Sequence, residues 1–263
     1  MKWMRFRQGD TEGFGLLDGA KVRVHKGNMF DDPTPTSEHV ALSEVQTLTP
    51  CQPSKMLGLW NNFHALAAKN AWATPAEPLY FLKANSSFAA HQQVIEPPAT
   101  EVGRVAFEGE LAVVIAKTCA RVSVADAPNF IFGYTCANDV TAIELLHRDP
   151  NFPQWARAKS FDGFGVFGPV IETDFDFSAA TLRTRVSGRE RQNYVLSDMI
   201  FSPAELVSRI SHDMTLVAGD VILCGTSLGV LPLKLGSEVE VEIDGIGVLS
   251  NRFGYAPLVN GDG

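Results

Sequence analysis

The chain has 263 residues, 45% of them hydrophobic, which is enough to build one large domain or one domain with a small appendage. Its formal net charge of −8 argues against a nucleic-acid groove or an anionic membrane surface as the main partner. The first ten residues carry charges instead of an apolar signal-peptide core, and no stretch reaches the roughly 18 apolar residues of a membrane span. We therefore expect a cytoplasmic protein that binds neither nucleic acid nor membrane.

Residues 1 to about 50 consist of short alternating runs broken by turns, as in FRQGDTEGFGLLDGAKVRVHKG, followed by the proline-rich DDPTPTSEH. This pattern predicts a small β-rich N-terminal subdomain over residues 1–52. The larger remainder, residues 53–263, is then expected to form the main domain.

A linker with Pro53 and Ser54 opens the main domain and leads into MLGLWNNFHALAAKNAW. Alanine, leucine and lysine dominate this segment, so it predicts a short helix that Asn61 or Asn62 caps. His64 then lies in the first turn of that helix.

Strand-like runs dominate the middle of the chain. They read YFLKANSSF, QQVIEP, FEGELAVVIAK and IFGYTCAND, with a short helix expected to start over Val122 to Ala127. The next segment, VTAIELLHRD, is helical in composition, and the long aromatic loop PNFPQWARAKSFDGFGVFGPVIET follows it. Loops of this length usually carry function.

The last third predicts strands in LRTRVSG and RQNYVLSDMI, an amphipathic helix opened by Ser202 and Pro203, and further strands in VILCGT and SEVEVEIDGIGVLSNRF. Since strands outnumber helices throughout, the expected fold class is α+β and β-rich. The chain's four cysteines lie far apart without CxxC spacing, so we expect buried free thiols instead of disulfides or a zinc site.

Three carboxylates indicate a metal site. Glu108 and Glu110 lie two residues apart at the head of the apolar run LAVVIA, so in a strand they project from the same face. Like charges placed this way repel unless a cation lies between them, and Asp139, at the end of IFGYTCAND, is the natural third ligand. Three carboxylates suit Mg²⁺ or Mn²⁺. Taken alone, the ExE pair is more often a solvated strand edge.

Two glycine motifs are rejected because their context is wrong. GxGxxG at residues 163–168 is followed by PVIETD instead of the helix that a dinucleotide site requires. GxSxG at residues 225–229 follows a strand, but VLPLKLGSEV after it will not form the helix of a nucleophile elbow. Neither an oxidoreductase nor a serine hydrolase is therefore expected.

Other polar residues end strands or lie in loops, as convergent functional groups do. They are Lys159 in RAKSFDGF and the turn formed by Gly225 and Thr226. The plain alternative for Lys159 is a surface lysine whose stem covers apolar side chains. His64 is a weaker candidate, because a lone histidine in a helix's first turn is often simply exposed.

Together these segments resemble the fumarylacetoacetate hydrolase superfamily, and specifically its bacterial single-domain branch. That branch includes acylpyruvate hydrolases, oxaloacetate decarboxylases and the 2-hydroxyhepta-2,4-diene-1,7-dioate isomerase/decarboxylases of aromatic compound catabolism. The segments that match are FLKANSS, EGELAVVI, GYTCANDVTA, RAKSFDGFGVFGP and most of the C-terminal half. The resemblance implies a mixed β-roll like the C-terminal domain of that family, and usually a homodimer.

The resemblance also implies roles for single residues. Glu108, Glu110 and Asp139 would hold Mg²⁺ or Mn²⁺. Lys159 and the turn with Gly225 and Thr226 would contact the 2-oxo carboxylate of the substrate. His64 would stand at the position of the lid histidine.

The chain departs from the family pattern around that histidine. Family members commonly carry an asparagine four residues before it and a glutamate three residues after it, where this chain has Trp60 and Ala67. The arginine common four residues after the aspartate ligand is Ile143, and the proline common in the turn is Ser227. His64 thus lacks its usual orienting partner, and substrate contacts are expected to differ.

These features predict a divalent-metal-dependent enzyme that acts on 2-oxo acids through an enolate held by the metal. The leading hypothesis is C–C bond hydrolysis of an acylpyruvate-like or fumarylacetoacetate-like substrate, with His64 as the base for water and Lys159 stabilising the developing negative charge. The alternative within enzymes is an isomerase or decarboxylase of 2-hydroxyhepta-2,4-diene-1,7-dioate or oxaloacetate, which the missing glutamate favours. The alternative from another class is a non-catalytic, metal-dependent 2-oxo-acid binding protein.

Aromatic residues near the candidate site residues could form a wall for a bulky or flat substrate tail. They are Trp60, Phe63, Trp72, Phe152 and Trp155. For any one of them, a place in the buried core is the plain alternative.

Overall fold

The computed structural model describes residues 1–256 of the chain, which in this range forms eighteen β-strands and four α-helices. The strands are β1 (Lys2–Gln8), β2 (Thr11–Asp18), β3 (Lys21–Asn28), β4 (Asp31–Ala41), β5 (Gln46–Thr47), β6 (Met56–Trp60), β7 (Leu79–Lys83), β8 (Phe88–Ala89), β9 (Val105–Ala106), β10 (Gly109–Ile115), β11 (Ile131–Asp139), β12 (Thr141–Ala142), β13 (Gly165–Glu172), β14 (Thr181–Val186), β15 (Arg189–Val195), β16 (Val221–Leu223), β17 (Glu238–Ile243) and β18 (Gly247–Arg252). The helices are α1 (His64–Lys69), α2 (Ile143–Leu146), α3 (Trp155–Lys159) and α4 (Pro203–Asp213). None of these helices combines the length and the hydropathy that a membrane span requires.

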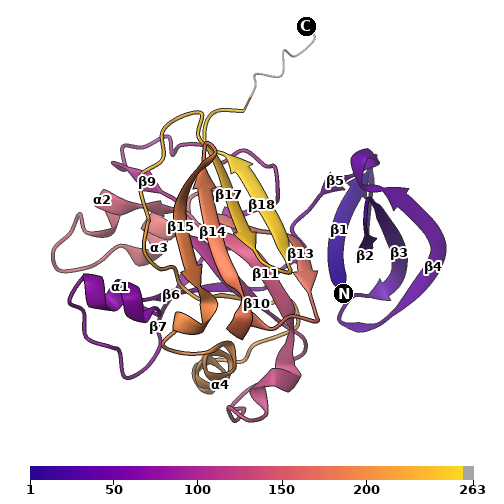
Figure 1. The fold of residues 1–263 in the computed structure, drawn as a ribbon, viewed down its shortest axis with the longest axis horizontal. Helices are drawn as coiled ribbons and strands as arrows, with labels where there is room; N and C mark the ends of the chain where they lie inside the picture. The colour runs from indigo at the N-terminus through magenta and orange to yellow at the C-terminus, as the bar shows by residue number, and fades with distance from the viewer. Residues whose placement is uncertain (257–263) are drawn as a thin grey trace, which may run out of the picture.

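Most strands belong to two sheets. The main path of the larger sheet runs β4-β3-β2-β1-β13-β11-β10-β16-β6-β7, and β5 and β8 pair beside it with β1 and β13, which gives twelve strands. The pairs β16–β6 and β13–β8 are parallel and the neighbours along the rest of the path are antiparallel, so the sheet is mixed. A four-stranded sheet, β15-β14-β17-β18, packs across the central strands of the first (Figure 1). The β-rich mixed roll expected from the sequence is confirmed.

Strand β10 shows how the core is divided. All its residues, Gly109–Ile115, are buried. Because side chains alternate between the two faces of a strand, Leu111 and Val113 join the large apolar cluster shared with the second sheet, whereas Ala112 and Val114 join a smaller cluster on the opposite face. A strand covered on both faces has a continuous apolar sequence, which is the reason that LAVVI does not alternate.

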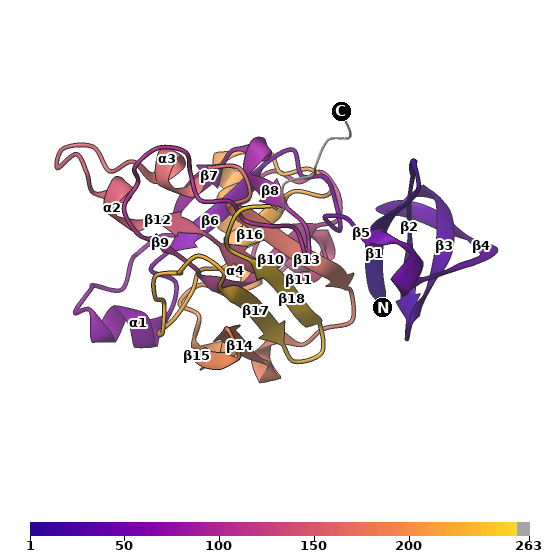
Figure 2. The same cartoon turned by 90° about the horizontal axis from the view of Figure 1, so that it is seen from above.

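The N-terminal strands β1 to β5 form an antiparallel meander that stands at the side of the main body in both views (Figures 1 and 2). Strand β1 continues the large sheet by pairing with β13, with Lys2 opposite Glu172 and Trp3 opposite Ile171. The β-rich segment expected at the N-terminus is therefore present. The division into domains at residues 1–52 and 53–263 stays a prediction.

Helix α1 begins differently from the sequence prediction. Phe63 occupies the N-cap position and no side chain caps the helix, so the prediction that Asn61 or Asn62 caps it is wrong. The Asn62 amide instead donates hydrogen bonds to the backbone carbonyls of Phe201 and Cys224, at 3.2 and 2.8 Å. Asn62 therefore makes two long-range hydrogen bonds in place of a helix cap, and they connect the segment before α1 to the residue that follows β16 and to the segment before α4.

Two other segments differ from the predictions because tertiary partners decide their conformation. The run QQVIEP forms no strand, and its Ile95 makes only an isolated bridge to Phe253. No α-helix starts over Val122 to Ala127; the chain turns there, and only a short 3₁₀ helix, Ala127–Phe130, begins at the last of these residues.

Two local predictions are confirmed. Ser202 caps α4, its hydroxyl accepting from the backbone of Glu205 while the Glu205 side chain bonds back to the backbone of Ser202. The four cysteines are buried free thiols: Cys51, Cys119, Cys136 and Cys224.

Asp220, directly before β16, holds the linker that follows the N-terminal meander. Its buried carboxylate accepts the backbone N–H groups of Ser54, Lys55 and Val217. It also accepts the Ser54 hydroxyl at 2.6 Å and the Lys55 ammonium at 2.5 Å. This carboxylate therefore fixes how β6, which follows the linker, lies parallel to β16.

Replacing Asp220 with alanine should lower the free energy of unfolding by about 3–5 kcal/mol, because it leaves buried donors and one ammonium without their acceptor. Urea denaturation measures the loss. The matched control is Asp244→Ala, which removes a half-exposed ion pair with Arg183 and should cost about 1 kcal/mol or less. Equal losses in the two variants would contradict the anchoring role of Asp220.

Candidate metal centre

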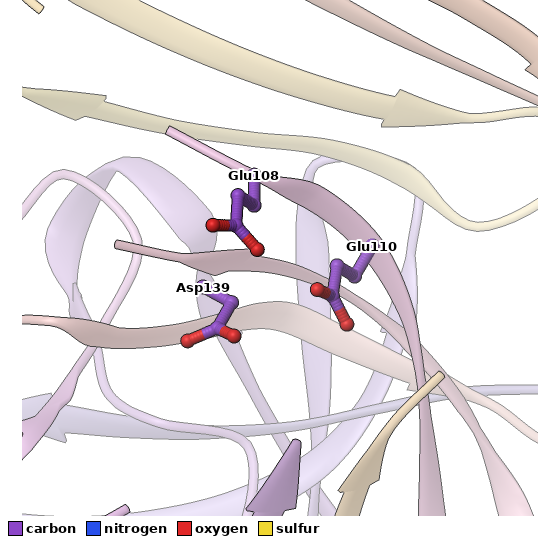
Figure 3. Close-up of side chains that lie close together, drawn as sticks. All are labelled: Glu108, Glu110 and Asp139. Atoms are coloured by element: carbon purple, nitrogen blue, oxygen red, sulfur yellow. The ribbon is translucent and has the colours of Figure 1, made fainter. Parts of the chain in front are cut away.

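Three carboxylates meet where β10 begins and β11 ends. Glu108 directly precedes β10, Glu110 is its second residue, and Asp139 is the last residue of β11. The two strands are antiparallel neighbours, and the Asp139 N–H donates to the Glu108 carbonyl at 2.8 Å, so the three side chains converge (Figure 3). One oxygen of each carboxylate lies within 4.8 Å of the others. The structure thus brings together the three residues that the sequence singled out.

Glu110 is the most confined of the three, because its side chain is completely buried. Burial and the nearby charges of Asp139 and Glu108 raise the pKa of Glu110 well above its ordinary value. One of its oxygens, Oε2, accepts the Gly225 N–H at 2.7 Å, whereas Oε1 has no hydrogen-bond partner among the described residues. A buried carboxylate oxygen that lacks a donor and faces two other carboxylates is suited to bind a cation.

Two buried lysines donate hydrogen bonds to carboxylates of the triad. The Lys159 ammonium donates to Asp139 Oδ2 at 2.6 Å and to Glu108 Oε2 at 2.9 Å. The Lys83 ammonium donates to Asp139 Oδ1 at 2.5 Å. Burial alone would raise the pKa of Asp139, but the charges of Lys159 and Lys83 outweigh it and lower that pKa.

The pKa values of the two lysines are shifted in opposite directions. Burial would lower the pKa of Lys159, but the charges of Asp139, Glu108 and Glu110 overcome it and raise that pKa, so this side chain is a permanent cation. For Lys83 burial dominates over the attraction of Asp139, with the charge of Lys159 acting in the same direction as burial, and its pKa is lowered.

Lys83 is a site residue that the sequence reasoning missed. It ends β7 and is as buried as the apolar residues around it. The available signal was a lysine inside the apolar strand YFLK, since a lysine is almost never fully buried unless it is paired. Lys159 was expected in a loop, but it is the last residue of the short helix α3.

The residues present fit a divalent cation. Three carboxylates and two ammonium groups leave one net negative charge, and Glu110 Oε1 offers a free ligand atom. An all-oxygen donor set of carboxylates suits Mg²⁺ or Mn²⁺. The Thr141 hydroxyl donates to Glu108 Oε1 at 2.7 Å and so orients the carboxylate of this candidate ligand. Hydrogen bonds of this kind commonly orient the ligands at metal sites.

The turn after β16 supports the triad. Gly225 has φ +89°, a conformation that favours glycine, and presents its N–H to Glu110. The Thr226 hydroxyl donates to the Gly109 carbonyl at 2.9 Å and accepts from the Gln192 side-chain amide at 2.8 Å. The turn therefore lies beside the predicted ligands, and its expected contact with a substrate stays a prediction.

His64 does not belong to this close group. It is the exposed first residue of α1, which lies at the periphery of the main body in both views (Figures 1 and 2). The N–H of the next residue, Ala65, donates to Asp198 Oδ2 at 2.9 Å. At the positions where the family carries partners for the histidine, Trp60 ends β6 and Ala67 is buried within α1.

The aromatic residues named from the sequence separate into two groups. Trp60 lies between Trp72 and Trp155, with ring centroids 4.9 and 6.2 Å away. Phe63 is instead core, packed at 5.0 Å against Tyr194, and Phe152 is 68% exposed. The structure thus gathers the three tryptophans but neither phenylalanine.

A family model described as fumarylacetoacetate (FAA) hydrolase C-terminal matches residues 55–254. A second model, described as Rv2993c-like, N-terminal, matches residues 1–50.

Several curated proteins are similar over most of the chain. Protein Rv2993c of Mycobacterium tuberculosis is 40% identical, with 95% of this chain and 97% of that protein covered. Oxaloacetate tautomerase YisK of Bacillus subtilis is 36% identical, with 81% and 75% covered. The 4-hydroxyphenylacetate degradation bifunctional isomerase/decarboxylase of Salmonella dublin is 35% identical, with 90% of this chain and 56% of that protein covered.

Solved structures agree with this pattern. The crystal structure of 2-hydroxyhepta-2,4-diene-1,7-dioate isomerase from Mycobacterium marinum aligns with a TM-score of 0.88 at 37% identity, covering 97% of this chain and 98% of the other. Maleylpyruvate hydrolase from Sphingobium sp. SYK-6, solved with manganese(II) and pyruvate, aligns with a TM-score of 0.79 at 23% identity, covering 98% and 100%. At that identity the second likeness shows the fold alone.

Glu110→Gln should separate stability from metal binding. The amide keeps an acceptor for the Gly225 N–H and cannot ionise. At a pH above the raised pKa of Glu110, where the parent carries a buried negative charge there, the metal-free variant should therefore melt at a higher temperature than the metal-free parent. Its affinity for Mn²⁺ should fall at least about 100-fold, since it loses a charged ligand.

Differential scanning calorimetry with and without Mn²⁺ measures both effects, because a ligand at free concentration c that binds only the folded state stabilises it by RT ln(1 + c/Kd), so weaker binding gives a smaller rise in the melting temperature. Glu12→Gln, at an exposed ion pair on β2, is the matched control and should keep the full Mn²⁺-induced shift. If Glu110→Gln also keeps that shift, the triad is not the metal site.

Proposed function

The chain belongs to the fumarylacetoacetate hydrolase family, and we propose that it catalyses metal-dependent keto–enol isomerisation of a 2-oxo acid. The observation that carries this proposal is the set of charges around Glu110: three carboxylates with one free ligand oxygen, bordered by two buried ammonium groups. Isomerisation moves one proton between C3 and the 2-oxo oxygen, and its barrier falls when the enolate between the two forms is stabilised.

Glu108, Glu110 and Asp139 would hold Mg²⁺ or Mn²⁺, which when bound supplies Lewis-acid stabilisation of the negative charge on the 2-oxo oxygen. Lys159 would attract the substrate carboxylate, and it can do so without reorganising because two carboxylates already fix it. Its raised pKa makes it a fixed positive charge and not a base. These local cations also account for how a chain with a net charge of −8 would bind an anion.

Isomerisation is favoured over hydrolysis because hydrolysis also needs an activated water. The family positions that commonly orient the lid histidine hold Trp60 and Ala67, neither of which can accept a proton. The names of relatives point the same way: an oxaloacetate tautomerase, a bifunctional isomerase/decarboxylase and, among solved structures, a 2-hydroxyhepta-2,4-diene-1,7-dioate isomerase. All three are 35–37% identical to this chain.

C–C bond hydrolysis of an acylpyruvate is the second candidate, and one contact favours it. Asp198 accepts a hydrogen bond from the backbone N–H of Ala65, the residue next to His64. The Asp198 carboxylate could therefore replace the missing glutamate as the partner of the His64 side chain. A homodimer, a cytoplasmic location, a part in aromatic compound catabolism and the choice between Mg²⁺ and Mn²⁺ stay predictions.

The enol form of oxaloacetate tests the first proposal, since its conversion to the keto form is followed by loss of the enol absorbance. We expect the protein with Mg²⁺ or Mn²⁺ to accelerate this conversion, and EDTA to abolish the effect. His64→Ala should reduce the rate less than about 3-fold if isomerisation takes place at the metal centre alone.

Two further measurements distinguish the alternatives. Metal-dependent cleavage of an acylpyruvate that His64→Ala or Asp198→Ala abolishes would support hydrolysis instead. Tight oxalate binding by calorimetry, without turnover of oxaloacetate or any acylpyruvate, would leave a metal-dependent binding protein and refute an enzymatic function.

Lys159→Met should lower kcat for enol-oxaloacetate about 100-fold, because it removes a positive charge that is already positioned beside the developing enolate. Affinity for Mn²⁺ should be unchanged or tighter, since the net charge of the centre changes from −1 to −2. Stopped-flow kinetics and calorimetry measure the two quantities. Lys117→Met, at an exposed lysine, is the control, and an equal kcat in both variants would argue against the role of Lys159.

A further inference from the structure

An uncharged pocket of about 430 Å³ is lined in part by β7, the strand that ends at Lys83 of the candidate metal centre. Its volume falls in the range of about 300–1,000 Å³ that small-molecule sites occupy. The residues that line it are Trp60, Pro78, Leu79, Tyr80, Phe81 and Trp155. The lining is mostly aromatic, and none of it carries a charge.

Strand register connects this pocket to the metal centre. Leu79, Phe81 and Lys83 alternate along β7, so all three face the same side, with about 6.6 Å between one and the next. Lys83 bonds to Asp139 of the triad, whereas Leu79 and Phe81 line the pocket. One face of a single strand therefore runs from the charged centre into the apolar pocket.

The neighbouring strand β6 is shaped to fit. Trp60 pairs with Leu79 and Gly58 pairs with Phe81, so their side chains share that face. A Cβ atom at Gly58 would lie 2.5 Å from the Phe81 ring, so the glycine is needed for the ring to lie where it does. The pocket wall is a packed, built feature.

Helix α3 makes the same connection on the opposite wall. Trp155 and Lys159 lie one helical turn apart and face the same side. The Trp155 ring stacks on the Phe81 ring with centroids 5.2 Å apart and an interplanar angle of 14°, and the Lys159 ammonium lies 5.0 Å from the Phe81 centroid. The Phe81 ring is thus the boundary between the charged centre and the pocket.

No residue that lines the pocket offers a positive charge to a second carboxylate. The Tyr80 hydroxyl donates a hydrogen bond to Asp213 Oδ2 at 3.0 Å. An anion beside this hydroxyl would therefore lie near the Asp213 carboxylate and not near a cation. Moving a charged group into such surroundings without a partner costs several kcal/mol. A flat apolar group would instead gain from burial and from stacking on aromatic rings.

We infer that the pocket binds an aromatic group on the distal side of the substrate, so that the chain is selective for aryl-substituted 2-oxo acids over dicarboxylates. The 2-oxo carboxylate lies at the metal centre and the ring lies past Phe81, against the exposed edges of Trp60 and Trp155 that line the pocket. This inference rests on the proposed function for its kinetic test, but its binding test does not depend on turnover.

The kinetic test compares the enol forms of phenylpyruvate and oxaloacetate with the Mn²⁺-loaded protein. We expect kcat/KM to be at least about 10-fold higher for phenylpyruvate, from burial and stacking of the ring. A preference for oxaloacetate, or equal values, would overturn the inference while leaving the isomerase proposal intact. If the protein converts neither enol, the isomerase proposal is refuted, and the binding test below then decides whether the pocket binds an aromatic group.

Two variants locate the selectivity in the pocket. Trp155→Ala should lower the ratio of the two kcat/KM values about 10-fold, because it removes a stacking surface. Leu79→Arg, at a 38% exposed position that tolerates a charge, should shift the ratio in the same direction by supplying a cation for the second carboxylate of oxaloacetate. Leu82→Ala is the matched control, since Leu82 is 47% exposed on the opposite face of the same strand, and it should leave the ratio unchanged.

The binding test uses calorimetry of the Mn²⁺-loaded protein with phenylpyruvate and with pyruvate. Phenylpyruvate should bind at least about 10-fold more tightly, and both Trp155→Ala and Leu79→Arg should reduce that difference. Because Leu79→Arg changes a partly exposed residue, it remains informative even if Trp155→Ala fails to fold. Equal affinities for the two ligands in the parent protein would overturn the inference.

Discussion

The pairing of three carboxylates with two buried lysines is the interaction on which the rest of the candidate site depends. Each charge alone would be costly to bury, and the cluster persists because Lys159 bridges Glu108 and Asp139 while Lys83 takes the other oxygen of Asp139. The groups come from β7, β10, β11 and α3, so the arrangement of sheet and helix fixes their spacing. In this low-dielectric interior the remaining negative charge acts strongly on a cation.

Several parts of this site could be predicted from the sequence because the signal is local. The ExE spacing places Glu108 and Glu110 on one face by the period of a strand, and Asp139 is marked by its place at a strand end. The cap of α4 is equally local, since Ser202 and Glu205 are three residues apart. The β-roll itself followed from the resemblance of whole segments to one family.

Other parts could not be predicted because their partners are distant in the sequence. Lys83 bonds to Asp139 across 56 positions, and nothing in YFLKANSSF says which residue would neutralise it. Asn62 looked like a helix cap, but it bonds instead to backbone groups near residues 201 and 224. The run QQVIEP has the composition of a strand, yet no neighbouring strand lies where it could pair over more than one bridge.

The two ends of strand β7 belong to different parts of the candidate site, so residues of the charged centre and residues of the pocket can be substituted independently. Lys83, at one end of one face of this strand, donates to Asp139 of the charged centre, whereas Leu79, at the other end of that face, lines the uncharged pocket. One departure from the family pattern lies on the apolar side of this division, because Trp60, which stands where family members commonly carry an asparagine, lines the pocket, while the carboxylates and Lys159 are kept. An indole in place of an amide removes a hydrogen-bonding group there and adds aromatic surface to the wall of the pocket. The change at Trp60, which weakens an assignment by analogy, is thus also one that would alter which substrates the site accepts.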